Sequence, residues 1–502
     1  MLSLLDLIAA GAGVNSRPWP RAVVDIAAWV YAIGQLADGR WSLSAFWGDA
    51  GAVHLALRDE TSGTVAALTL LCPDRTFPSV GLRHPPARRL ERAISDLWGL
   101  AATDTPDPRP WLDHGKWNSA PFAADAESSE RRTDYPFLPV DGDNLHEVAV
   151  GPIHAGIIEP GHFRFTASGE TVVRLEERLG YAHKGIEAHM AGAEVNTALA
   201  LAERTSGDST VAYTLAFSRS VEAALEIAPP RRAEWLRALA LELERIANHL
   251  GDFGAVCNDA AFTLIHAHCA MLREDILRTA ESLFGSRLMR GLIAPGGVCV
   301  DPSPHALDGL ARLADTIERR LGLLTETFEE TSSLQDRTVG TGRVSLALVR
   351  QFAAGGFVGR ASGRPFDARK AYPFPPYDTL TFDPPTLVAG DVDARVRIRI
   401  LEIQQSLGLI RQIVRTLPPE AHYTHHTTFD RAGEGASIVE GFRGDILVWL
   451  RIDDRGRIER CHLRDPSWFQ WPLLEAAIEG NIIADFPLCN KSFNCSYSGH
   501  DL

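Results

Sequence analysis

Long apolar stripes at helical spacing run through the second half of the chain and limit its fold more than any other feature. In the segment 232–250, Leu236, Leu239, Leu243, Ile246 and Leu250 recur at intervals of three and four residues, which is the period of one helix face. The same period continues through the segments 268–283, 304–324 and 393–417. Helices with this much apolar surface have to cover one another, so the pattern predicts a helix bundle.

Residues 1–115 follow a different pattern. Strand-like runs at 53–57 and 65–71 precede a predicted helix at 86–100, whose Leu90 and Ile94 fall on one face. The stretch 116–145 is polar, aperiodic and contains proline, so we interpret it as a flexible linker in which proteases cut first.

Short strand-like segments also flank the helical region. They lie at 147–150 and 163–166 before it, and at 437–440 and 445–451 after it, followed by a last predicted helix at 472–478. The sequence therefore predicts an α+β fold: a small α/β domain (1–115), a linker (116–145) and a mainly helical domain with small β elements (146–502).

Length, charge and cysteine content exclude several classes of protein. A chain of 502 residues is too long for one core, and a net charge of −14 argues against nucleic-acid binding. The seven cysteines are scattered, which favours a reducing cytosol over a disulfide scaffold. The apolar N-terminus has no basic start and is interrupted by Asp6, and no run reaches the roughly 20 apolar residues of a membrane span. We expect any membrane role to depend on partner subunits.

Three segments are unusual for a plain scaffold. GPIHAGIIEPGHFRF (151–165) places His154 and His162 among glycines and prolines. GYAHKGIEAHM (180–190) places His183 just inside a predicted helix start, together with its neighbours Tyr181 and Lys184. ERTSGDST (203–210) breaks an apolar helical pattern with small polar residues. Such breaks indicate a cavity, a partner contact or a site. For any one segment alone, the alternative of a hydrogen-bonded buried histidine and a turn glycine is favoured.

Taken together, these segments resemble the large subunit of membrane-bound group 4 nickel–iron hydrogenases, of the hydrogenase-4 and formate hydrogenlyase type, and the related 49-kDa-type subunit of complex I. ELERIANHL (242–250), RTVGTGR (337–343), ASGRPFDARKAYPFPPY (361–377) and RVRIRILEIQQSL (395–407) carry the same resemblance. The segments 77–100 and 110–117 resemble the 30-kDa-type subunit of complex I, so the chain looks like a fusion of the two subunits.

The resemblance implies a nickel site built from two Cys-x-x-Cys pairs. Here the first pair falls on Ser206 and Ser209 and the second on Cys495 and Ser498, so one thiol of four remains. A serine hydroxyl is a poor ligand for nickel, and we expect no nickel–iron centre and no metal in this chain. The resemblance places an iron–sulfur cluster in an adjacent partner subunit. Because only four residues follow Ser498, we also expect no proteolytic maturation.

Quinone chemistry is the alternative within the same resemblance. His154 stands in the glycine-rich loop that carries a proton-donating histidine in complex I. The position of the second proton donor, a tyrosine, falls on Gly207, and Tyr213 lies about two helical turns further on. The candidate catalytic residues of the cavity are His154, His183, Arg204 and Asp208, with His162, Asp367 and Arg369 as further members. A buried Arg204 needs an acidic partner or a ligand, and Asp208 lies one turn away and can pair with it if the segment is helical.

The C-terminal segment 481–502 is predicted to be buried and to bring Cys495 and Ser498 close to Ser206 and Ser209, around a small polar pocket. Cys489 and Cys495 are either a redox couple, part of a metal site or small buried residues, and the last interpretation is favoured.

The function that the resemblance implies is that of a peripheral large subunit in a complex I-like or hydrogenase-related respiratory assembly. It would lie on the cytoplasmic face of the cell membrane, beside a small iron–sulfur subunit, a ferredoxin-like subunit and antiporter-like membrane subunits. NAD binding and proton translocation are activities of such NADH–quinone oxidoreductase assemblies. The chain would couple electron transfer or conformational change to ion translocation. Quinone binding or reduction, and structural coupling without redox chemistry, are the alternatives.

Overall fold

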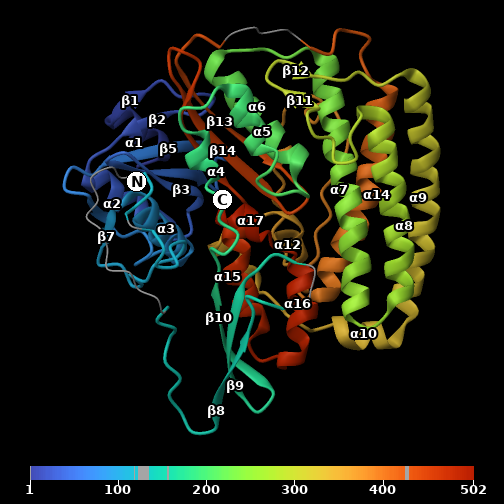
Figure 1. Cartoon of the computed structure of the whole chain (residues 1–502), viewed down its shortest axis with the longest axis horizontal. Helices are drawn as coiled ribbons and strands as arrows, with labels where there is room; N and C mark the ends of the chain where they lie inside the picture. Colours follow the sequence, from blue (N-terminus) through green and yellow to red (C-terminus); the bar gives the residue numbers. More distant parts are fainter. Residues whose placement is uncertain (1, 118, 123–134, 155–157, 424–428) are drawn as a thin grey trace.

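Long helices packed side by side form one flank of the molecule (Figure 1). The computed structural model describes residues 2–117, 119–122, 135–154, 158–423 and 429–502. The bundle consists of α7 (Arg231–Asp259), α8 (Thr263–Phe284), α9 (Pro304–Glu330) and α14 (Val392–Arg415). Each helix covers a segment with the predicted period, so the expected bundle and the α+β class are confirmed.

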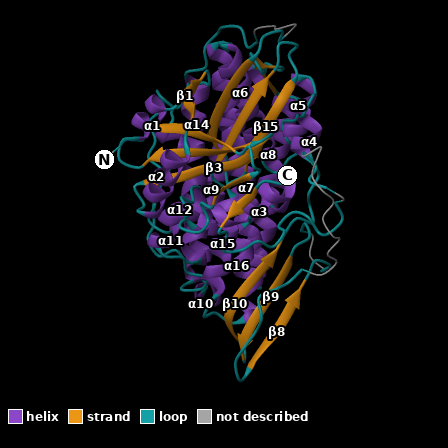
Figure 2. Ribbon diagram, turned by 90° about the vertical axis from the view of Figure 1, so that its left-hand side faces the viewer, coloured by secondary structure: helices purple, strands orange, loops and turns teal. Residues whose placement is uncertain are grey.

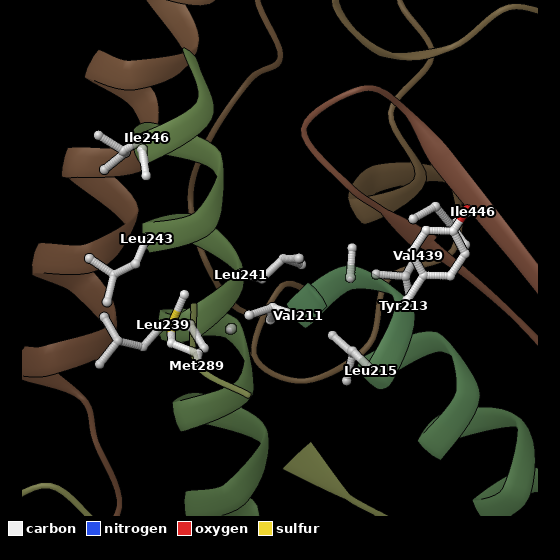
Figure 3. Packing of buried hydrophobic residues seen from close by; sticks show 14 of the residues in the cluster. Val211, Tyr213, Leu215, Leu239, Leu241, Leu243, Ile246, Met289, Val439 and Ile446 are labelled. Carbon is white, nitrogen blue, oxygen red and sulfur yellow. The ribbon is translucent and has the colours of Figure 1, made fainter. Parts of the chain in front are cut away.

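Helix α7 lies at the centre of the bundle and is buried along most of its length. It contacts α8 and α14, and α6 (Thr210–Leu225) packs near its side. Figure 3 shows Leu239 and Leu243 of α7 within the apolar cluster that also includes Val211 of α6. At Gly254 an added Cβ would lie 2.9 Å from the Cβ of Cys269, so a glycine permits the close crossing of α7 and α8. Because neighbouring elements cover α7 on all sides, its charged residues are buried together with its apolar ones.

The N-terminal part contains a five-stranded sheet with the order β1-β2-β5-β4-β3. Its neighbouring strands are antiparallel except for the parallel pair β2 and β5. The strands are β1 (Ala12–Val14), β2 (Arg21–Val23), β3 (Trp41–Asp49), β4 (Ala52–Asp59) and β5 (Val65–Leu71). Helices α1 (Leu4–Ala10), α2 (Ile26–Ala37) and α3 (Arg88–Trp98), the short 3-10 helix η1 (Pro85–Ala87) and the strand pair β6 (Thr76–Pro78) and β7 (Ala101–Thr103) complete this part.

Residues of the N-terminal part share a hydrophobic core with later segments. Trp111, Phe163 and Trp471 belong to one buried cluster, and Arg21 forms a buried ion pair with Glu434. The described ends of the predicted linker also contact this body: Phe122 stacks on Trp98 and the Leu138 amide donates to Glu176. Residues 118 and 123–134 of that segment lie outside the described residues, so its predicted flexibility remains a prediction.

Two three-stranded antiparallel sheets follow in the second part. The first consists of β8 (Leu145–Val150), β9 (His162–Ser168) and β10 (Thr171–Arg178), and it projects from the body (Figures 1 and 2). The second consists of β13 (Gly433–Glu440), β14 (Asp445–Ile452) and β15 (Ile458–Arg464), and α6 packs on β13 and β14. The hairpin-like pair expected at 437–451 is therefore present, with a third strand added.

Short elements connect these layers. They are α4 (Ile186–Met190), α5 (Val195–Ala202), β11 (Ile293–Ala294), β12 (Gly297–Val298), α10 (Ser332–Thr338), α11 (Leu346–Gln351), α12 (Gly356–Ala361) and α13 (Ala368–Ala371). None of the described helices combines the length and apolar character needed to cross a membrane.

The C-terminal segment folds back into the interior. The helix predicted at 472–478 begins earlier, as α15 (Ser467–Ile478), and is followed by η2 (Ile483–Asp485), α16 (Phe486–Phe493) and α17 (Tyr497–Asp501). Phe493 and Cys495 are buried, as is every residue from Tyr497 to Leu502. The predicted burial is confirmed for the end of this segment but is wrong for its start, where Ile482 is 39% exposed and Ile483 is only partly buried.

Candidate functional site where two serine segments meet

The loop between α5 and α6 meets the segment between α16 and α17. The Oγ atoms of Ser206 and Ser496 are 2.8 Å apart, and both side chains are buried. The amide of Ser496 donates to Ser467 Oγ over 2.8 Å, which fixes the C-terminal segment against the start of α15. The two segments predicted to meet therefore do so, and the hydrogen bond between them passes through Ser496, which was not among the predicted site residues.

An ion pair lies beside this contact. The Arg443 guanidinium donates to both oxygens of Asp208, over 2.7 and 2.5 Å, and to Ser209 Oγ over 3.3 Å. Ser206 Oγ donates to Asp208 Oδ1 over 2.8 Å. Burial would raise the pKa of the Asp208 carboxyl, but Arg443 holds it below its usual value. A fixed cation and an ionised carboxylate therefore stand where the two serine segments meet.

The predicted pairing of Arg204 with Asp208 is wrong. The residues from Arg204 to Ser209 form turns and not a helix, so the spacing of four residues does not bring the two side chains together. The Arg204 side chain is 55% exposed and lies 3.3 Å from Glu203. The buried cation expected at Arg204 is supplied by Arg443, from a turn more than 230 residues later in the sequence.

Glycines allow that turn to approach. Arg443 lies in the Gly441–Gly444 turn between β13 and β14. Gly356, at the start of α12, has φ +63°, and a Cβ added there would lie 1.9 Å from the carbonyl oxygen of Arg443. Only glycine permits this conformation and this contact together. The GFRG sequence between two predicted strands was the available signal for a special turn, but it did not reveal the partner of the arginine.

A second carboxyl group, that of Glu244, lies near Asp208. Glu244 of α7 accepts hydrogen bonds from the amides of Val211 and Ala212, over 2.6 and 3.1 Å, at the start of α6. Burial raises the pKa of Glu244 to about 8, against the effect of these amides. Asn248, one turn further along α7, donates to the carbonyl of Asp208 over 2.7 Å. Through Asn248, helix α7 thus holds the loop that contains Asp208. Through Glu244, it adds a carboxyl that is protonated near neutral pH.

Cys495 is buried next to this contact as a neutral thiol. Burial, and then the nearby Glu177, raise the pKa of Cys495 well above its usual value. The amide of Ser498 donates to Glu159 Oε2 over 2.9 Å. Glu159 belongs to the segment GPIHAGIIEPGHFRF, but it was not among the predicted site residues. Cys489 is also buried and free, so the two thiols form no disulfide.

The predicted histidines have separate environments. His154 lies in the loop between β8 and β9 and is partly exposed. His162 Nδ1 is 3.0 Å from the carbonyl of Gly151, and burial lowers the pKa of His162. His183 Nδ1 is 2.7 Å from the carbonyl of Asp501, and its ring contacts Trp117. The prediction that residues 181–184 lie inside a helix start is wrong, because α4 begins at Ile186, after Gly185 with φ +68°.

Tyr213 does not replace the tyrosine that the complex I resemblance places at Gly207. Its hydroxyl donates to Asp465 Oδ2 over 2.6 Å in a fully buried contact. Among the residues that the structure describes, a Cβ added at Gly207 would meet no atom within 4 Å. The loop therefore borders open space at Gly207. The Tyr213 side chain is instead hydrogen-bonded at the junction of β15 and α15.

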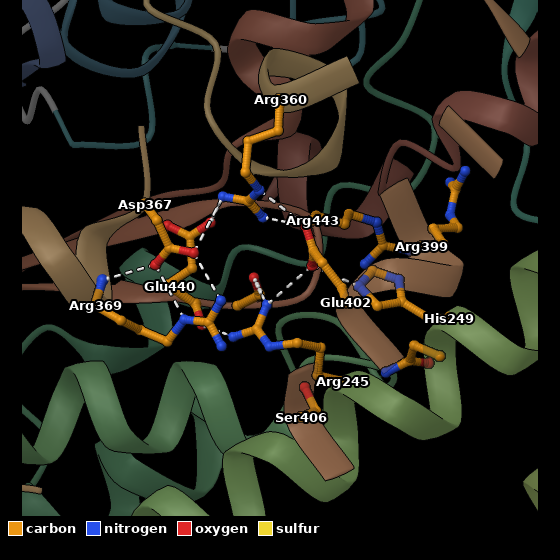
Figure 4. Close-up of polar contacts among 12 residues, drawn as sticks. Arg245, His249, Arg360, Asp367, Arg369, Arg399, Glu402, Ser406, Glu440 and Arg443 are labelled. Carbon is orange, nitrogen blue, oxygen red and sulfur yellow. Dashed lines mark hydrogen bonds and ion pairs between the residues drawn. The ribbon is translucent and has the colours of Figure 1, made fainter. Parts of the chain in front are cut away.

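Asp367 and Arg369 belong to a buried ion network deeper in the fold (Figure 4). Arg369 contacts Asp367 over 2.6 Å and Glu242 over 2.9 Å. Arg360 contacts Glu402 over 2.6 Å and Glu440 over 2.9 Å. Arg245 of α7 lies 3.3 Å from Glu242, and His249 Nε2 lies 2.8 Å from Glu402. All of these side chains are fully buried.

The ion pairs of this network join more carboxyl groups than guanidinium groups. Among the described residues that form it, the guanidinium groups of Arg245, Arg360 and Arg369 face four carboxyl groups. Burial lowers the pKa of His249, so the imidazole does not supply the missing positive charge. Burial, and then Asp367, raise the pKa of Glu440 to about 7. Glu440 is therefore a buried carboxyl that titrates close to neutral pH.

Known respiratory and hydrogenase proteins share much of this sequence. Residues 259–431 and 422–501 match the family model described as respiratory-chain NADH dehydrogenase, 49 Kd subunit. Formate hydrogenlyase subunit 5 of Escherichia coli is 31% identical over 437 residues, which are 85% of this chain and 77% of that protein. A carbon monoxide-induced hydrogenase of Rhodospirillum rubrum is 30% identical over 70% of this chain and 98% of its own length. An NADH-quinone oxidoreductase protein of Koribacter versatilis is 26% identical over 70% of this chain and 94% of its own length.

Proposed function

Because this chain belongs to the family that includes formate hydrogenlyase subunit 5 and the 49-kDa subunit of respiratory-chain NADH dehydrogenase, we propose that it is the peripheral large subunit of a membrane-associated, complex I-like or hydrogenase-related complex without a nickel–iron site. In this proposal it couples electron transfer or conformational change to ion translocation. Its place is on the inner face of the cell membrane, beside a small iron–sulfur subunit, a ferredoxin-like subunit and antiporter-like membrane subunits.

The proposal that the chain lacks a nickel–iron site rests on the side chains that lie at the serine contact, because these side chains would have to supply the metal ligands. Ser206 Oγ is already engaged with Asp208 and Ser496, at 2.8 Å each. Arg443 occupies the neighbouring position with a guanidinium, which has only N–H donors and no lone pair for a metal, and it engages both oxygens of Asp208. Cys495 is the one thiol that remains at the four positions. Hydroxyls, a guanidinium and a single thiol do not fit a centre that requires four thiolates.

Metal analysis of the purified complex tests this function. We expect iron from the partner's cluster and less than about 0.1 nickel per chain, because ligands that lose thiolate character lose their preference for soft metals. About one nickel per chain would contradict the proposal. The same complex purified from cells grown with added nickel is the matched control, since it separates absence of a site from absence of the metal.

The arrangement supports a role in holding and moving charge. The Arg443–Asp208 pair fixes the loop that faces the C-terminal segment, and Glu244 and Glu440 are two buried carboxyls that titrate near neutral pH. Groups with such pKa values exchange protons in response to small changes of nearby charge. In the proposed complex, a change of charge at the adjacent cluster would shift the protonation of these carboxyls and so bias the packing of the loops they fix.

Quinone binding is the second candidate function, and the open space at Gly207 is the observation that favours it. His154 would be the proton donor in this case. Gly207→Tyr restores the tyrosine of the resembling subunits, and the absence of nearby atoms leaves room for its side chain. If a quinone is the acceptor, this variant of the assembled complex should reduce a short-chain quinone analogue faster than the native complex. An unchanged rate, with Gly207→Phe as the control for bulk, would count against quinone as the acceptor.

A further inference from the structure

A carboxyl pair that the proposed function does not use lies where three elements join below the C-terminal segment. Arg89 of α3 contacts Glu177 of β10 over 3.0 Å and Glu475 of α15 over 2.6 Å. The Glu177 amide donates to Glu475 Oε1 over 2.9 Å, which holds the two acids close together. The Arg89 guanidinium also lies over the ring of Trp111, 4.5 Å from its centroid. Two acids therefore share one cation at this joint.

The two acids differ in exposure. The Glu177 side chain is fully buried, while Glu475 is 22% exposed and Arg89 is 11% exposed. Glu177 Oε1 is buried and has no hydrogen-bond partner among the described residues. A buried carboxylate oxygen without a donor is costly, and a proton on the pair removes that cost. The arrangement thus has an inner acid with an unsatisfied oxygen and an outer acid within reach of solvent.

The groups that face the pair do not supply a second positive charge. Cys495 and Tyr497 of the C-terminal segment lie within electrostatic range of Glu177, and His500 and Tyr135 lie within range of Arg89. On the same strand, Glu176 is bound to Arg109 and lies within electrostatic range of Glu475, where it adds negative charge. Burial and the neighbouring Glu475 raise the pKa of Glu177 well above its usual value.

We propose that Glu177 and Glu475 form a proton-binding site that holds one exchangeable proton, with Glu475 as its outer and Glu177 as its inner end. The proton enters from solvent at Glu475 and passes to Glu177, next to the buried thiol of Cys495. Loss of the proton leaves an uncompensated negative charge at the joint of α3, β10 and α15. Its use during redox turnover rests on the proposed function, whereas proton binding by the chain does not.

Infrared spectroscopy of the purified full chain tests this site, with ¹³C-glutamate labelling to separate Glu from Asp absorption. The native chain at neutral pH should show the carbonyl absorption of a protonated glutamic acid, and alkaline pH should remove it. In a native-minus-variant difference spectrum, Glu177→Gln and Glu475→Gln should each show the loss of one component of that absorption, because the remaining carboxylate then faces Arg89 alone and ionises. The components of Glu244 and Glu440, which also titrate near neutral pH, should remain in both variants. Glu147→Gln, at an exposed position of the same three-stranded sheet, is the matched control and should retain every component.

The outcomes separate this proposal from its alternatives. Difference spectra that show no lost component in either glutamine variant would overturn the site, and so would the absence of the absorption from the native chain. Circular dichroism checks that each variant is folded. Glu475→Asp keeps an acid at the outer position and supplies a second test, in which the absorption should move in frequency; an unmoved band also overturns the proposal. Because the measurements use the chain alone, they can fail while the nickel analysis of the complex succeeds, and the reverse.

Discussion

Replacing Arg443 should leave Asp208 as an uncompensated charge at the serine contact. Arg443 is 4% exposed and donates to both oxygens of Asp208. Removing one partner of a buried ion pair costs about 3–5 kcal/mol. Since the Asp208 side chain is 33% exposed, water compensates part of this loss, and we expect Arg443→Met to lower the free energy of unfolding by about 2–3 kcal/mol.

A double-mutant cycle separates the ion pair from the packing of the arginine. Asp208→Asn removes the charge of the partner, so the double variant with Arg443→Met should be less destabilised than the sum of the single variants by about 1–2 kcal/mol. Urea unfolding followed by tryptophan fluorescence measures each free energy. Arg278→Met is the control, since its pair with Glu274 is solvent-exposed, and it should change stability by less than about 0.5 kcal/mol. Strict additivity of the two single changes would refute the reasoning.

Further predictions concern the network, the C-terminal segment and the missing thiols. The pKa of Glu440 is raised from 4.5 to about 7, so its contribution to stability is present below the unfolded pKa and is lost as pH rises through 7. Glu440→Gln should flatten this loss in unfolding curves measured between about pH 5 and pH 8. Deleting residues 491–502 removes the buried Phe493 and Tyr497 and should destabilise the chain by more than about 5 kcal/mol, measured by urea unfolding; an unchanged midpoint would show that the segment is peripheral. Restoring cysteine at Ser206, Ser209 and Ser498 should give no hydrogen uptake, since the centre also requires dedicated maturation, and measurable uptake would contradict this.

The sequence alone determined the features that depend on local period and local chemistry. The bundle followed from apolar spacing in segments such as 232–250, because one helix face repeats every three to four residues whatever it packs against. The apolar composition of 481–502 correctly predicted the burial of the last residues, including Phe493 and Tyr497, but not the exposure of Ile482. The start of α4 did not follow from the sequence pattern. The tight turn at Gly185, with φ +68°, precedes the helix, so α4 begins at Ile186 and not at 181–184.

Only the tertiary structure decided which charges meet. Asp208 pairs with Arg443 and not with the nearby Arg204, because the intervening residues form turns and because glycines admit the distant β13–β14 turn. The raised pKa of Glu440 likewise depends on carboxyls and guanidiniums brought together from α7, α12, α14 and β13. Burial and ion pairing are set by neighbours in space, and the free energy of a charge changes by several kcal/mol with those neighbours. A single sequence contains the charged residues but not their distances.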